Sequence, residues 1–160
     1  MAQLVLIPQY PFRTTRTFER FPMISFSENN YPGIRLDRAF NDDLNGLDHP
    51  DSTPALTQTA KKVALRINWP GYPEWHDVIH AFDHRYDANP VTQRRLAYLV
   101  ARKIQTCMQD ISVHFMQSSA AINLQWRVEN FRLEDLVLLQ LVHVSPGSWQ
   151  PVLAYHPRQF

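Results

Sequence analysis

Three histidines recur at intervals of four residues in the segment 73–90, which reads PEWHDVIHAFDHRYDANP. They are His76, His80 and His84, and the carboxylates Asp83 and Asp87 accompany them. If the segment is helical, residues four apart lie on one face and these five side chains share a sector. Imidazole and carboxylate groups are the ligands that zinc prefers in proteins. The five residues are therefore a candidate metal site.

The stretch HDVIH within this segment is similar to the H-E-x-x-H pattern of zinc hydrolases, with Asp77 in place of the glutamate base. A metal-dependent hydrolase would hold zinc on His76 and His80, with His84 or a distant histidine as third ligand. However, aspartate is one methylene shorter than glutamate, and no spacing selects the third ligand. We therefore favour a solvated polar flank of a helix with no cofactor, and keep the zinc hydrolase as an alternative.

A helix over residues 73–86 is the element that would position these histidines. Pro73 suits the first position of a helix, and the helix is expected to end before Pro90. Five apolar residues recur at helical spacing and would form its buried stripe. These residues are Trp75, Val78, Ile79, Phe82 and Tyr86.

Two further helices follow from the same spacing rule. Apolar residues recur through residues 92–115 and predict a long helix, with Thr92 as its cap and Cys107 on its core face. A shorter amphipathic helix is predicted over 37–46, with Asp37 as its N-cap.

Three strands are predicted from alternation and apolar runs. Period-two alternation predicts a strand at 63–69. The turn SPGS joins two further strands, 136–144 and 149–156, into a hairpin. Pro151 lacks an N–H group, which favours an edge position for its strand. The fold class is therefore α+β, with an antiparallel or mixed sheet of at least three strands covered by the long helix.

Composition and length limit the domain organisation and the partners. With 160 residues we expect one domain at 34–160, preceded by an extended arm at 1–33 that is rich in aromatic residues and prolines and packs along it. The net charge of +1 provides no field for nucleic acid, and no apolar run is long enough to span a membrane. The single cysteine and the absence of a secretory signal favour the cytoplasm or the nucleus.

Three blocks of the sequence resemble a family of uncharacterised small proteins from mushroom-forming basidiomycete fungi. The blocks are RINWPGYPEW, NPVTQRRLAYLVARKI and VLLQLVHVSPGSWQPVLAY. The resemblance implies a lineage and an intracellular setting, but it implies no catalytic residue. The triple histidine lies outside the family's pattern, and the corresponding stretch in the family is loop-like.

Aromatic and arginine side chains supply the remaining functional candidates, because both types are enriched at binding hot spots. We predict a non-catalytic protein-interaction or scaffold module whose partner is another protein. The alternatives are the zinc hydrolase and a small-molecule-binding domain with an aromatic pocket between the hairpin and the helix. The candidate interaction residues are Trp69, Tyr72, Trp75, Trp149, Arg94 and Arg95.

Overall fold

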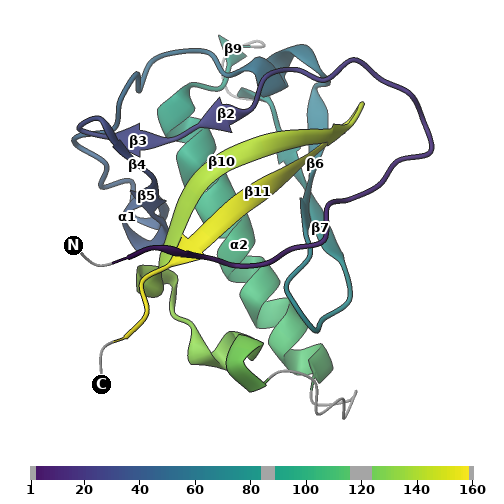
Figure 1. Ribbon diagram of the computed structural model, residues 1–160. Helices are drawn as coiled ribbons and strands as arrows, with labels where there is room; N and C mark the ends of the chain where they lie inside the picture. The colour runs from purple at the N-terminus through teal and green to yellow at the C-terminus, as the bar shows by residue number, and fades with distance from the viewer. Residues whose placement is uncertain (1–2, 84–88, 116–123, 159–160) are drawn as a thin grey trace.

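The fold consists of one curved sheet with a long helix across its rear face and the N-terminal arm around its front face (Figure 1). The computed structural model describes residues 3–83, 89–115 and 124–158. The long helix is α2 (Gln93–Phe115), which agrees with the predicted helix over 92–115. The predicted α+β class is confirmed.

Within the described residues, seven strands form the main sheet, and its central path runs β2–β10–β11–β6–β7. β5 also pairs with β10, and β1 also pairs with β11. The β11–β6 pair is parallel and the other pairs are antiparallel, so the sheet is mixed. The bounds are β1 Val5–Leu6, β2 Ile24–Ser25, β5 Ile34–Arg35, β6 Lys62–Ile67, β7 Trp75–His80, β10 Leu136–Ser145 and β11 Ser148–Tyr155.

The remaining elements are short and connect or cover the sheet. Two small antiparallel ladders, β3–β4 and β8–β9, stand apart from it. Their bounds are β3 Ser27–Glu28, β4 Tyr31–Pro32, β8 Phe82–Asp83 and β9 Asn89–Pro90. The other helical segments are α1 Leu36–Phe40 and the 3₁₀ turns η1 Ala55–Gln58, η2 Leu124–Trp126, η3 Val128–Asn130 and η4 Leu133–Asp135.

Helix α2 forms because its apolar residues make one continuous stripe, and the stripe is buried against the sheet. Thr92 caps the helix through the hydrogen bond that its Oγ1 accepts from Arg95 N at 3.1 Å. No described helix is long and apolar enough to cross a membrane. The buried residues of the stripe are Leu96, Ala97, Val100, Ala101, Ile104, Cys107, Met108 and Ile111.

The helix predicted over 73–86 is wrong, because the chain there forms strand β7. β7 pairs with β6 over its whole length, from Lys62↔His80 to Ile67↔Trp75. The turn before it contains Gly71, whose φ of 85° a residue without a side chain adopts easily. The edge of β6 offers β7 a full ladder of backbone hydrogen bonds. Of the predicted stripe, Ile79 is buried, Trp75 and Phe82 are partly buried and Val78 is exposed, and Tyr86 lies outside the described residues.

The helix predicted over 37–46 is also wrong in its extent, because α1 contains only five residues. The chain leaves the helix at Asn41 and Asp42, and Asp42 has a positive φ of 53°. Short polar side chains of this kind compete with helical hydrogen bonds and tolerate left-handed backbone. Leu44 and Leu47 are buried as predicted, but they reach the core from a loop.

The edge position predicted from Pro151 is wrong, because β11 lies between β10 and β6 in the sheet. β6 pairs with the first residues of β11 and β1 with the last ones, and Pro151 lies between these two pairings. Its carbonyl accepts a hydrogen bond from Nε2 of Gln9 at 2.7 Å. A residue without an N–H group is tolerated there because a side chain, rather than a strand backbone, faces it.

Candidate functional site

The helical face on which the alternative zinc site was based is absent, because His76 and His80 lie on strand β7. Four residues along a strand span about 13 Å, so His76 and His80 are too far apart to hold one ion. His84 and Asp87 lie outside the described residues, and so does the side chain of Asp83. Among the described residues, no group of three or more His, Cys, Asp or Glu side chains is placed to hold a metal.

Asp77, the predicted base of the hydrolase, is part of an ion pair. Nζ of Lys103 on α2 donates to its Oδ2 at 2.7 Å, and the backbone N–H of Val78 donates to its Oδ1 at 2.7 Å. The hydrogen bond from Lys103 is the main reason why the pKa of Asp77 lies below its usual value. A carboxylate held in this way is a weak base and joins β7 to the helix.

Three of the aromatic interaction candidates are buried in the core. Trp69 is 2 % exposed, Trp149 0 % and Tyr72 8 %. The indole N–H of Trp69 donates to the carbonyl of Trp126 at 2.7 Å. The hydroxyl of Tyr72 accepts a hydrogen bond from Val128 N at 3.0 Å, and burial raises its pKa. These rings fix the 3₁₀ turns against the sheet, and their burial excludes them from an interaction surface.

The other three candidates reach solvent: Arg94 and Arg95 lie together in the first turn of α2, whereas Trp75 lies on β7. Trp75 is half-buried, and its indole N–H donates to Asp110 at 3.0 Å. Arg94 is ion-paired with Asp42 at 2.9 Å. Arg95 is exposed, and its guanidinium lies 4.8 Å from the centre of the Tyr98 ring.

Cys107 has no nucleophilic character in this fold. It is 1 % exposed, and burial raises the pKa of its thiol to about 12. Only the thiolate is a strong nucleophile, so Cys107 acts as a small apolar core residue at neutral pH.

The interface between hairpin and helix, where an aromatic pocket is predicted, is packed core that includes Trp149. A cavity of about 500 Å³ lies instead where the N-terminal arm crosses the hairpin β10–β11. We call this cavity the arm groove. Its lining residues are Leu6, Ile7, Pro8, Gln9, Pro11, Phe12, Arg20, Val142, Val144, Gln150, Pro151 and Val152.

Two glutamine side chains hold the arm against the hairpin and shape the groove. Besides its bond to Pro151, Gln9 accepts from the backbone N of Asn68 at 2.9 Å and from Nε2 of Gln150 at 3.3 Å. Gln150 in turn accepts from the backbone N of Phe12 at 2.9 Å. The arm contains prolines at 8 and 11 and forms no long ladder, so these amides take the place of backbone pairing.

A buried histidine anchors the far end of the arm. His143 is 3 % exposed, and its Nδ1 accepts from the backbone N of Phe21 at 3.2 Å. Its ring stacks on Trp149 with the centroids 4.7 Å apart, and the Phe18 ring packs on it edge-on at 4.9 Å. The arm is therefore fixed on both sides of the segment that carries Arg20.

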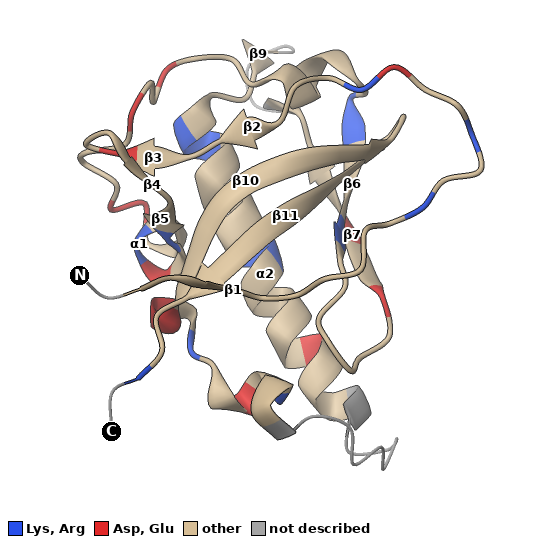
Figure 2. Ribbon diagram, in the orientation of Figure 1, with Lys and Arg blue, Asp and Glu red and all other residues tan. Residues whose placement is uncertain are grey.

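The arm groove is apolar and has one charged residue in its lining. The valines of both hairpin strands form its floor, and no acidic residue lines it. The segment 12–22 carries Arg13, Arg16, Arg20 and a single acid, Glu19, and Figure 2 shows this positive bias along the arm. Among the described residues, none of these three arginines has an acidic group within ion-pairing distance.

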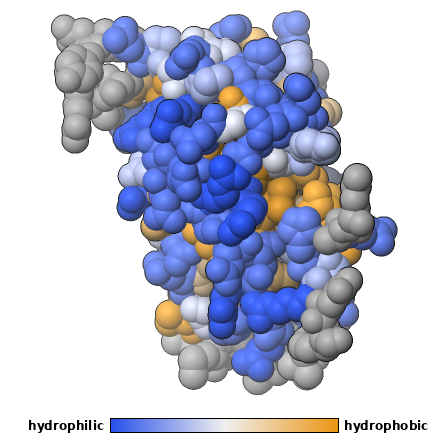
Figure 3. Space-filling view, turned by 90° about the vertical axis from the view of Figure 1, so that its left-hand side faces the viewer, coloured by the Kyte–Doolittle hydropathy of each residue, from blue (hydrophilic) through white to orange (hydrophobic). Residues whose placement is uncertain are grey.

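The side of the molecule next to the groove-bearing face is mainly polar. Figure 3 views the side of the molecule that carries α1 and the β3–β4 ladder, and that surface is mainly hydrophilic. An apolar patch is visible near its right-hand edge, which is the side of the face seen in Figure 1. Leu6, a groove residue, is 57 % exposed.

The arm groove was not predicted from the sequence, although one pattern pointed to it. Strand 136–144 is apolar on both faces, and only one long helix was available to cover the sheet. One face therefore had to be covered by something irregular, and the arm of residues 1–33 was the remaining segment. Strand β7 gave no such signal, because its sequence WHDVIH does not alternate between apolar and polar residues: Asp77 shares the inward face with Trp75 and Ile79.

Comparisons with protein-family models, with curated proteins and with solved structures found no match. The resemblance to the basidiomycete family is untested by these comparisons and stays a prediction.

Proposed function

We propose that this protein is a non-catalytic binding module and that the arm groove is its ligand site. The observation that carries the proposal is the apolar cavity of about 500 Å³ on the face of the sheet that α2 leaves uncovered. Small-molecule sites have volumes of about 300–1,000 Å³ and apolar linings with a few polar groups, and the arm groove matches this description.

The chemistry of the candidate catalytic residues supports a role in binding. Asp77 is engaged by Lys103, and the Cys107 thiol is protonated at neutral pH. The side chains of Gln9 and Gln150 in the groove hold the arm in place. The groove therefore offers shape and apolar surface to a ligand, with a single cation at its margin.

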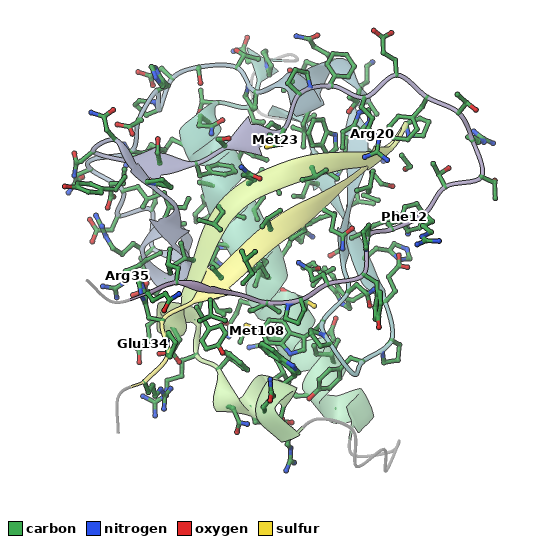
Figure 4. The ribbon with its side chains drawn as sticks, in the orientation of Figure 1. Phe12, Arg20, Met23, Arg35, Met108 and Glu134 are labelled. Carbon is green, nitrogen blue, oxygen red and sulfur yellow. The ribbon has the colours of Figure 1, made fainter. Side chains whose placement is uncertain are left out.

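A protein partner is a second candidate function, and exposed apolar side chains favour it. Leu6 and Tyr10 on the arm are 57 % and 83 % exposed, and Met23 is 54 % exposed. Met23 lies on the opposite side of β10 from the crossing arm (Figure 4). Contiguous exposed apolar patches are typical of interaction sites, and Leu6 and Tyr10 lie on the same arm. As part of this proposal, the setting is the cytoplasm or the nucleus.

Fluorescence of the neutral apolar probe N-phenyl-1-naphthylamine tests the ligand site. We expect saturable, one-to-one enhancement of its emission by the native protein. Val142→Gln places an amide in the groove and should weaken binding at least tenfold. Val113→Gln is the matched control, because Val113 is 62 % exposed on α2 and lies outside the groove. Equal binding by both variants, or no binding by the native protein, would contradict the proposal.

A further inference from the structure

We infer that the ligand of the arm groove is a monomeric medium-chain aliphatic carboxylate, with its tail on the hairpin valines and its head group on Arg20. The inference rests on the proposed binding function and names the class of ligand for the same site. Three properties of the groove lead to it: the apolar floor, the position of the cation, and the engagement of the other polar groups.

The floor of the groove suits an alkyl chain. Val142 and Val144 of β10 and Val152 of β11 line it, and Ile7 and Leu6 from the arm form one wall. These side chains have no hydrogen-bonding groups, so an apolar chain placed on them loses no polar contact. A flexible aliphatic tail also adapts to the irregular wall that the arm provides.

Arg20 is the one ionisable residue of the groove lining. Figure 4 shows it at the distal end of β10–β11, with Phe12 on the arm below it. Its guanidinium lies 5.4 Å from the centre of the Phe18 ring, and no described acidic group pairs with it. Since no acid lines the groove, the charge complement of this site is an anion.

The number of available donors favours a monoanion. The amides of Gln9 and Gln150 are already hydrogen-bonded within the protein, so Arg20 is the group left to bind a head group. A guanidinium matches a planar carboxylate through two parallel hydrogen bonds. A phosphate monoester carries up to two charges and three acceptor oxygens, which a single arginine leaves partly unpaired.

Displacement of N-phenyl-1-naphthylamine by decanoate and by decanol, both as monomers at low salt, tests the inference. The two ligands have the same chain and differ in the head group. In the native protein we expect decanoate to bind about tenfold more tightly than decanol, which corresponds to one charge-assisted hydrogen-bonding interaction. The preference should decline in 0.5 M salt, because Arg20 is exposed.

Arg20→Gln should remove the preference for decanoate and leave decanol binding unchanged. Arg16→Gln is the matched control: Arg16 is an exposed arginine of the same arm that does not line the groove, and its replacement should keep the preference. Equal binding of decanoate and decanol by the native protein would overturn the carboxylate inference and leave the proposed binding function intact.

Five other outcomes would contradict the carboxylate inference, and one of them would also contradict the proposed function. Displacement of the bound probe by neither ligand would overturn the inference alone, whereas failure of the native protein to bind the probe would remove both the inference and the proposed function. Tighter binding of decyl phosphate than of decanoate would contradict the monoanion. Tighter binding of a short apolar peptide with a free C-terminal carboxylate would identify a protein segment as the occupant. A preference that survives Arg20→Gln would show that another cation holds the head group.

Discussion

The two faces of the hairpin β10–β11 carry similar side chains but are covered in different ways. On the rear face, Leu138, Leu141 and Leu153 are at most 1 % exposed in the core beneath α2. On the front face, Val142 and Val152 are only partly buried and line the arm groove. A helix presents a regular stripe that packs without gaps, whereas an extended arm with prolines touches the sheet at intervals. The gap between those contacts is the binding site that we propose.

Replacement of Leu141 by Ala should give the largest change, because it opens a cavity on the rear face. We expect the free energy of unfolding to fall by about 3 kcal/mol. Val142→Ala, one residue along the same strand, should cost less than about 1 kcal/mol. Leu and Val differ by one methylene, or about 0.8 kcal/mol. The rest of the difference between the two losses of unfolding free energy reflects the tighter packing of the rear face. Urea unfolding monitored by fluorescence measures both values, and equal losses would contradict the comparison.

Gly33→Ala tests the part of the front face that the chain does cover. Gly33 has a φ of 92°, and an added Cβ would lie 2.5 Å from Cγ1 of Val137. Strain and this close contact together should lower the free energy of unfolding by about 2 kcal/mol. The control is Gly147→Ala, where an added Cβ meets no atom within 4 Å. Thermal unfolding measures both variants. Similar midpoints would show that the chain around Gly33 packs only loosely on the front face of the sheet.

Gln9→Ala removes the amide that links the arm to Pro151, Asn68 and Gln150. The free energy of local opening of the arm should then fall by about 1 kcal/mol, while the core beneath α2 is unaffected. Tryptic cleavage after the exposed Arg13 or Arg16 should become about fivefold faster. Gln58→Ala, an exposed glutamine in η1, serves as the control. An unchanged cleavage rate would mean that the arm is held by other contacts.

Asp77→Asn should have the smallest effect, at the margin where β7 meets α2. The pKa of Asp77 is lowered in the folded protein, so its ion pair stabilises the fold above the pKa of the unfolded chain and is lost as the pH falls below about 4. Because the pair is partly exposed, we expect a loss of only about 0.5 kcal/mol at pH 6, and this loss should shrink as the pH is lowered below about 4. Asp51→Asn, at an exposed position without an ion pair among the described residues, should show no such trend. A pH-independent difference would contradict this account.

Sequence periodicity was sufficient where one element buries one complete face. The apolar stripe of α2 fits only a helix, and the alternation of β6 fits only a strand. Both elements form where they are predicted. The segment 73–86 satisfied a helical pattern and shows no strand-like alternation of apolar and polar residues, yet it contains a strand. Periodicity alone does not resolve such a case, because the choice depends on whether a neighbouring strand edge is available. The zinc hypothesis followed from the helix, and the four-residue spacing of His76 and His80 lost its meaning on a strand.

By itself, the sequence determined the α+β class, the long helix, the hairpin and the burial of Cys107, since each follows from local patterns of apolar residues. Only the tertiary structure decided the central place of β11, the strand at Trp75–His80 and the cavity beneath the arm. These features depend on contacts between residues far apart in the chain, such as Gln9 with Gln150. Local patterns carry no information about which distant segment completes a sheet edge or covers a face.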